Sequence, residues 1–136
     1  MTDQERRARN LAAVQGAFAA VGAADADAQV THYTDDAVLE MPFLDPPART
    51  EGKAAIHERL AGAFTVFRFA LTIEHVVECL DPDELVVEFT SKGTVTTTGK
   101  PYANRYIARF RFRDGLICFQ REYFNPNAAA TALQPD

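Results

Sequence analysis

The chain has no tryptophan, only two cysteines and only three histidines. Cys79 and Cys118 lie in apolar, strand-like patterns without a CxxC spacing, so we expect two reduced packing residues. The scattered histidines form no metal-binding spacing with them. A glycine-rich phosphate loop and a nucleotide fingerprint are also missing. The sequence therefore predicts a protein with no metal and no cofactor.

Positive charge and long apolar runs are also scarce. A net charge of -5 excludes the basic footprint of a sequence-independent nucleic-acid binder. The sequence shows no signal-like or membrane-length apolar segment, so we expect a cytoplasmic protein with neither nucleic-acid nor membrane partners. With 136 residues, 47% of them hydrophobic, the chain suits one domain over residues 1–136. Residues 128–136 are candidates for a flexible tail.

Helical periodicity dominates the first half of the chain. Apolar residues recur every three or four positions within residues 4–22, which predicts an amphipathic helix ended by Gly22. Asp25 is a suitable N-cap for a short second helix that continues to Tyr33. The segment 37–43 reads as a strand that Pro42 either ends or places at a sheet edge. A turn-rich connection over 45–52 precedes a third helix containing Ile56, Leu60, Phe64 and Phe67.

After the third helix the period changes to two. Extended segments are predicted at 68–80, 84–97, 102–113 and 116–125, and Asp114-Gly115 is the strongest hairpin signal. Helices followed by an antiparallel meander indicate an α+β domain, in which three N-terminal helices cover one face of a curved sheet and enclose a pocket.

Glu122 is the first candidate for chemistry. Counting by two along its strand places it on one face with Cys118, Gln120 and Phe124, which is mostly apolar. Burial of a carboxyl group raises its pKa toward values useful for proton transfer at neutral pH. The alternative is a buried structural acid that pairs with Arg121, Arg105 or a backbone amide.

Other polar side chains are expected near the same pocket. On segment 102–113, Asn104 and Tyr106 share a face with three apolar side chains, and we expect both to contact a substrate. The alternating arginines of this segment are expected to face solvent or another subunit. Four further residues are expected in the wall of the pocket: Phe18, Tyr33, Met41 and Phe43. Three polar side chains are also candidates for ligand contact: His32, His57 and Arg59, of which Arg59 could orient a ligand carboxylate.

The order of elements resembles the SnoaL-like branch of the nuclear-transport-factor-2-like superfamily over nearly the whole chain. The resemblance rests on Tyr33-Thr-Asp-Asp-Ala-Val-Leu-Glu-Met-Pro-Phe43, on Gly52 before the third helix, and on the Arg113–Ile117 hairpin. The segment Arg121-Glu-Tyr-Phe-Asn-Pro126 is most similar to the phenazine-biosynthesis A/B isomerase proteins. This resemblance implies a cone-shaped barrel, usually dimeric, with a deep apolar cavity and a proton-transferring acid at Glu122.

Several positions depart from other members of that superfamily. The base of the ketosteroid isomerases falls at Met41, their tyrosine near Ala17 or Phe18, and their neutral acid near Ala108, so that mechanism is rejected. The third-helix histidine of the phenazine proteins falls at Arg59. Limonene-type epoxide hydrolases need two acids, and a second would have to come from Glu40 or Asp45.

Two principal hypotheses follow. In the first, the protein is a cofactor-independent isomerase, cyclase or dehydratase that acts on a small hydrophobic or aromatic substrate, with Glu122 as general acid or base. In the second, it is a noncatalytic module that binds an apolar ligand or forms a dimer. An epoxide hydrolase is a third hypothesis. Ile117, Phe119 and Tyr123 lie opposite Glu122, which favours a homodimer through the outer face of the sheet.

Overall fold

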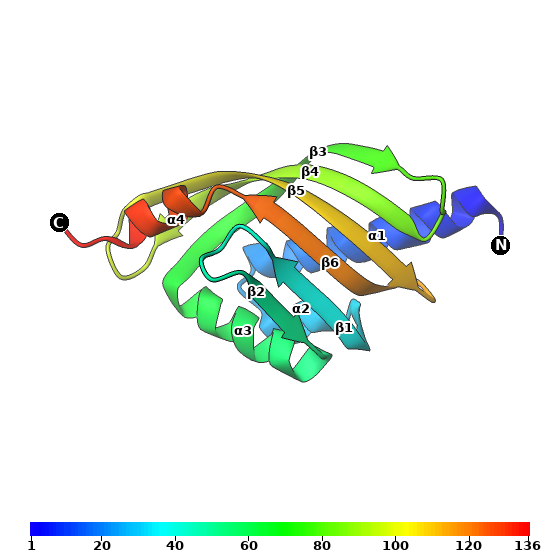
Figure 1. Cartoon of the computed structure of the whole chain (residues 1–136), viewed down its shortest axis with the longest axis horizontal. Coiled ribbons are helices and arrows are strands. Elements are labelled where there is room, and N and C mark those ends of the chain that lie inside the picture. Colours follow the sequence, from blue (N-terminus) through cyan, green and yellow to red (C-terminus); the bar gives the residue numbers. More distant parts are fainter.

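The computed structural model describes all residues 1–136 and shows one curved sheet with helices on its concave side (Figure 1). No helix is both long and apolar enough to span a membrane. The helices and strands are α1 (Asp3–Gly22), α2 (Ala26–Val30), β1 (Tyr33–Met41), β2 (Ala48–Glu51), α3 (Lys53–Val66), β3 (Phe67–Glu78), β4 (Glu84–Val95), β5 (Pro101–Arg113), β6 (Leu116–Phe124) and α4 (Pro126–Leu133).

The sheet has the strand order β2-β1-β6-β5-β4-β3. Strands β3 to β6 form the antiparallel meander that the sequence predicts. Outside this meander, β1 runs parallel to β6. The segment predicted as a turn-rich connection contains β2, which pairs antiparallel with β1. The sheet is therefore mixed, and its first and last strands lie side by side in the middle.

The boundaries of the early elements also differ from the prediction. Helix α2 ends at Val30, and Tyr33 already belongs to β1 because the His32 carbonyl accepts a hydrogen bond from the Ile117 amide at 2.8 Å. Phe67 begins β3 instead of continuing α3. As a consequence the Tyr33 ring points into the core, where it is almost fully buried.

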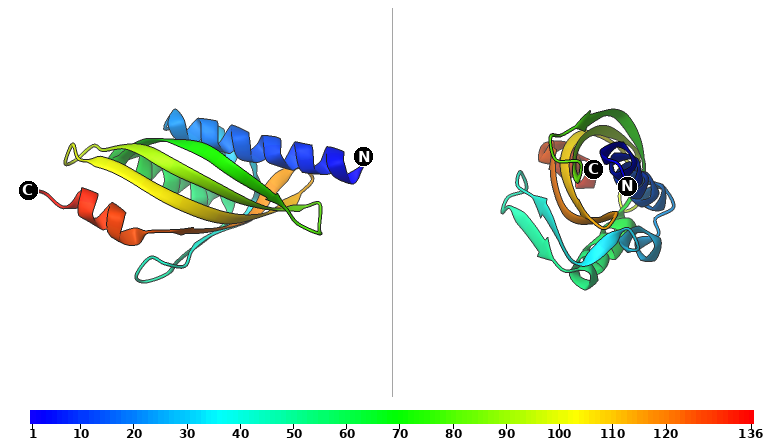
Figure 2. Two further views of the ribbon diagram at one scale, coloured as in Figure 1. Left: turned by 90° about the horizontal axis from the view of Figure 1, so that it is seen from above. Right: turned by 90° about the vertical axis from the view of Figure 1, so that its right-hand side faces the viewer.

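Helix α1 lies along the concave face of the sheet (Figure 2). A capping box between Thr2 and Glu5 starts the helix. Its buried stripe includes Val14, Ala17 and Phe18, as the periodicity predicts, and the Phe18 ring packs against Phe89 with centroids 4.6 Å apart. This packing between α1 and β4 is part of the main hydrophobic core.

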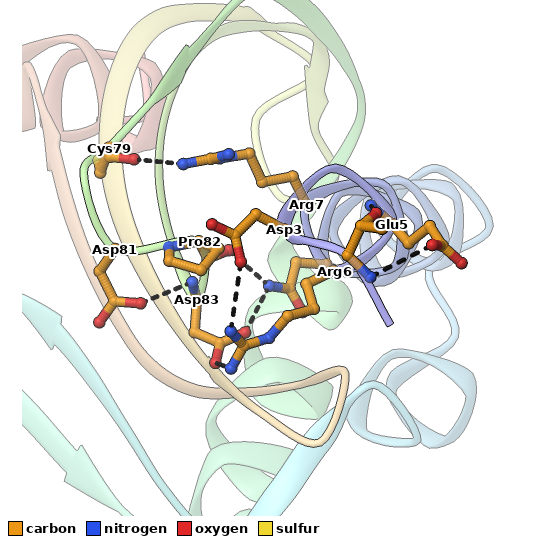
Figure 3. Close-up of polar contacts among 10 residues, drawn as sticks. Asp3, Glu5, Arg6, Arg7, Cys79, Asp81, Pro82 and Asp83 are labelled. Atoms are coloured by element: carbon orange, nitrogen blue, oxygen red, sulfur yellow. Dashed lines mark hydrogen bonds and ion pairs between the residues drawn. The ribbon is translucent and has the colours of Figure 1, made fainter.

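The N-terminal turns of α1 are fastened to the loop between β3 and β4 (Figure 3). The Arg6 guanidinium donates to Asp83 at 2.9 Å, and the Asn10 amide donates to the Pro82 carbonyl and to Asp83, both at 3.0 Å. Arg7 donates to the Cys79 carbonyl at 3.0 Å. Since Asn10 is fully buried, these contacts fix the position of α1 along the sheet.

Residues 126–133 form helix α4, which includes most of the segment given above as a candidate flexible tail. Asn125 caps α4 by accepting from the Asn127 amide, and Pro126 occupies the first turn, where its missing N–H costs nothing. Ala132 is buried against Val95 and Tyr102. Helix α4 therefore lies beside the β4–β5 turn at one end of the molecule (Figure 1).

A β-bulge at Cys118 changes the phase of β6. Phe112 pairs with Ile117 and Arg111 pairs with Phe119, so Cys118 has no partner on β5. The predicted shared face of Cys118, Gln120 and Glu122 is therefore wrong for Cys118. Ile117, expected on the outer face, is fully buried in the core instead. Both cysteines are free and half-buried.

Candidate active site

An apolar cavity of about 300 Å³ lies between the concave face of the sheet and α1, α3 and α4. Of its 22 lining residues, 18 are hydrophobic, so the positions of the remaining four decide its chemistry. These four are Gln29 of α2, Arg59 of α3, and Gln120 and Glu122 of β6.

Glu122 is the only carboxyl group in the lining. It projects inward because it follows Gln120 by two residues on β6, and its cross-strand neighbour on β5 is the small residue Ala108. Glu122 is half-buried and belongs to the cavity lining. Burial raises the pKa of Glu122 from 4.5 to about 7, and a hydrogen bond from Gln120 lowers it only partly.

A chain of three side chains leads from the buried core to this carboxyl group. The Tyr33 hydroxyl donates to Gln120 Oε1 at 2.5 Å, and Gln120 Nε2 donates to Glu122 Oε1 at 3.2 Å. Burial raises the pKa of Tyr33 well above its usual value, so this phenol remains a donor. Because the Gln120 carbonyl is occupied by Tyr33, the amide directs its N–H groups toward Glu122.

A second polar network lies beside Tyr106. Its ring stacks on Phe89 with centroids 4.6 Å apart, and its hydroxyl donates to Ser91 at 2.8 Å. The Tyr102 hydroxyl lies 3.0 Å from that of Tyr106 and accepts from Asn104 at 2.9 Å. Burial raises the pKa of Tyr106 as well, so both networks present neutral hydroxyl groups around the acid.

The sequence profile of the SnoaL-like domain matches residues 14–120. The chain belongs to the SnoaL-like domain family. An uncharacterised PhzA/B-like protein of Pseudomonas aeruginosa is 35% identical over 105 residues, which cover 74% of this chain and 73% of that protein. The uncharacterised protein YesE of Bacillus subtilis is 34% identical over 97 residues, covering 69% of this chain and 66% of YesE.

Solved structures share the whole SnoaL-like fold. A proposed isomerase from Bacillus subtilis has a TM-score of 0.86 at 29% identity, covering 97% of this chain and 95% of its own. A phenazine biosynthesis-related protein from Pseudomonas aeruginosa has a TM-score of 0.81 at 21% identity, with coverage of 98% and 90%. A Mycobacterium tuberculosis protein in complex with estradiol-17β-hemisuccinate has a TM-score of 0.77 at 23% identity, with coverage of 88% and 96%. The fold is thus nuclear-transport-factor-2-like, or ketosteroid isomerase-like.

The structure brings most of the predicted site residues of this SnoaL-like chain into one cavity. Glu122 and Tyr106 lie on neighbouring strands, and β1 contributes two further residues. The predicted residues that line the cavity are Phe18, Tyr33, Met41, Arg59, Tyr106 and Glu122. No group of three His, Cys, Asp or Glu side chains is arranged to hold a metal ion.

Asn104 lies outside the cavity lining, contrary to prediction. It is buried on the expected face of β5, but all of its bonds are made to the protein. Its Nδ2 donates to the Asn125 carbonyl at 2.9 Å and its Oδ1 accepts from the Asn125 amide at 3.1 Å. Asn104 therefore joins β5 to the start of α4, and alternation alone could not separate this role from ligand contact.

Phe43, His32 and His57 also lie away from the cavity. Phe43 follows Pro42 beyond the end of β1, is 58% exposed, and packs edge-on against Tyr123 on the outer side. The His32 ring lies so close to Gly16 of α1 that a Cβ there would come within 2.4 Å of it. His57 contacts Asp27 of α2 at 2.6 Å.

The proposed second acids of an epoxide hydrolase are not in the lining. Glu40 points outward and accepts from Arg121 at 2.9 Å and from Arg49 at 2.8 Å. The hydrogen bond from Arg121 is the main reason why the pKa of Glu40 falls below its usual value. Asp45 is exposed. With one acid in the cavity, the two-acid activation of water has no basis here.

Sequence reasoning missed several lining residues. Gln29 and the α4 residues Ala129 and Leu133 carry no motif, and the aromatic walls Phe67 and Phe69 could not be separated from ordinary core residues. Gln120 was recognisable as a face partner of Glu122, but its link to Tyr33 depends on the parallel pairing of β1 with β6. Only that pairing brings Tyr33 beside the last strand.

Proposed function

We propose that this SnoaL-like protein is a cofactor-independent enzyme that isomerises, cyclises or dehydrates a small apolar substrate, with Glu122 as its general acid and base. The observation that carries the proposal is a single carboxyl group in an apolar cavity with a pKa near 7. Such a group exists in both protonation states at neutral pH, as proton transfer in two directions requires. The isomerase and phenazine-related relatives support this class of reaction.

The geometry suggests how the proton moves. Glu122 Oε1 accepts from Gln120, whereas Oε2 has no hydrogen bond within the protein and is free for the ligand. In an isomerisation, Oε2 takes a proton from one substrate atom, the bonding electrons shift along the substrate, and Glu122 returns a proton to another atom. The carboxyl proton exchanges with water between the two transfers, so hydrogen from the solvent enters the product. The Gln120 N–H stabilises the carboxylate during the interval in which Glu122 is charged.

Deuterium exchange offers a test that needs no prior substrate assignment. The protein is incubated in D2O with a panel of cyclic enones and ketones, and incorporation of deuterium is followed by mass spectrometry. Glu122→Gln should lose about 10²- to 10⁴-fold in rate, the usual contribution of general acid or base catalysis. Glu58→Gln, which alters an exposed acid on α3, is the matched control. Equal rates in wild type and Glu122→Gln would refute the role of Glu122.

We also propose that two copies of the chain associate through the outer face of the sheet. Ile107 on β5 is 49% exposed, and Phe43 and Tyr123 form an aromatic pair on the same side. Phe119 is less available, since Arg109 and Arg121 lie over its ring at 5.6 and 5.2 Å. Ile107→Glu should shift the sedimentation coefficient of a dimer to that of a monomer. A wild-type protein that sediments as a monomer would contradict this proposal.

A further inference from the structure

Arg59 is the only cationic residue among the 22 that line the cavity. It lies on α3 one turn before Ala63, and both residues are exposed, as is the lining residue Leu133 of α4. The deeper lining residues, such as Tyr33 and Phe89, are buried. Arg59 therefore lies at the rim of the cavity, where a bound molecule would enter.

The Arg59 guanidinium has no acidic partner. Its one polar contact is to Met41 Sδ at 3.8 Å, and a thioether sulfur is a weak acceptor. Two other arginines nearby, Arg49 and Arg121, are both engaged by Glu40 on the outer side of β1. The positive charge at the rim is thus left available, although the chain carries 19 acidic residues.

Met41 connects the rim to the acid. Leu39 pairs with Gln120 and Glu40 with Arg121, so the next step of this parallel register places Met41 beside Glu122. The cavity therefore has a cation at its opening, an apolar surface behind it, and an acid further inside. A ligand anion is attracted at the opening and repelled by Glu122 when that group is ionised.

We propose that the ligand is an amphipathic carboxylate, held with its carboxylate on Arg59 at the rim and its apolar body in the cavity. A planar guanidinium can donate two parallel hydrogen bonds to a carboxylate, which an amide group on the ligand cannot accept in the same way. The position of the reacting atom rests on the proposed function: with the carboxylate on Arg59, that atom lies in the apolar body of the ligand, away from the carboxylate.

Binding of a matched pair of compounds tests the proposal. The probes are 4-phenylbutyrate and 4-phenylbutyramide, which have the same shape and differ in charge, measured by calorimetric titration at pH 8. Wild type should bind the acid about tenfold more tightly than the amide. This preference lies between the contribution of a solvent-exposed ion pair and that of a desolvated ion pair. The preference should shrink in high salt.

Variants assign that preference to one side chain. Arg59→Gln should weaken binding of the acid to the level of the amide and leave the amide unchanged, while Arg59→Lys should keep part of the preference. Arg68→Gln removes the same charge from an exposed residue of β3 outside the cavity lining, and it should change neither compound. Glu122→Gln should retain the preference, so failure of catalysis by Glu122 would leave this result intact.

Three outcomes of the titrations with wild type and Arg59→Gln would overturn the proposal. They are equal affinity of wild type for the acid and the amide, equal losses for both compounds in Arg59→Gln, and no binding of either compound up to its solubility limit. An equal effect of Arg68→Gln and Arg59→Gln would also overturn it, because the preference would then reflect the net charge of the protein.

Discussion

The buried carboxyl group of Glu122 should make the stability of the protein depend on pH in a direction opposite to that of most acids. Its pKa is raised from 4.5 in the unfolded chain to about 7 in the folded state. Between these values the folded protein binds one proton more than the unfolded chain, so the free energy of unfolding falls as the pH rises. The favourable contribution is complete below pH 4.5 and is lost as the pH passes through about 7.

The size of the effect follows from the shift. One pKa unit corresponds to about 1.4 kcal/mol, so the loss amounts to about 3 kcal/mol between pH 4.5 and 8. That is a large part of the free energy of unfolding of a typical domain, which is roughly 5 to 15 kcal/mol. Replacement of Glu122 by glutamine keeps the shape of the side chain and removes its titration.

Urea denaturation of wild type and Glu122→Gln across this pH range provides the measurement. The many surface acids affect both proteins equally, so the difference in unfolding free energy isolates Glu122. As the pH rises across this range, the unfolding free energy of Glu122→Gln should increase by about 3 kcal/mol relative to that of wild type. Glu58→Gln should show no such trend. A constant difference between wild type and Glu122→Gln would refute the assignment of a buried, pKa-shifted acid.

Three further predictions concern the framework of the cavity. Gly93→Ala should lower the unfolding free energy by more than about 3 kcal/mol, because a Cβ there would lie 1.9 Å from the Arg68 carbonyl oxygen. Its control is Gly62→Ala, in open space within α3, which should raise the unfolding free energy by about 0.5 to 1 kcal/mol in the same chemical denaturation. Asn104→Ala should lower thermal stability by about 2 to 4 kcal/mol while leaving affinity for a cavity ligand within about twofold, since it removes four protein hydrogen bonds and no lining group. Ala132→Asp should release α4, seen as loss of hydrogen-exchange protection in residues 126–133 alone, since that charge would be buried between Val95 and Tyr102.

The local patterns of the sequence predict the helices and the meander well, because both depend on neighbours along the chain. The alternation in β5 places Tyr106, Phe110 and Phe112 inside and the arginines mostly outside, as expected. The bulge at Cys118 could not be predicted, since a period of two gives no sign of one extra residue. The same limitation hid the inward position of Ile117.

Contacts between distant segments account for most of what the sequence did not reveal about the site. Strand β2 and the parallel pairing of β1 with β6 have no local signature, and that parallel pairing alone brings Tyr33 to Gln120. Asn125 followed by Pro126 was a recognisable helix start, although the alanine-rich segment after it suggested a frayed end. Glu122 could be proposed because one acid in an apolar strand face is visible without any tertiary knowledge.

The parallel pairing of β1 with β6 has a consequence for the order of folding. The hairpins from β3 to β6 close short loops. The contact between Val38 and Phe119 instead closes a long loop that contains all the residues between them. We expect this closure to come late, and the cavity forms only when it is complete. A ligand of the finished cavity should then leave the refolding rate unchanged and slow unfolding instead.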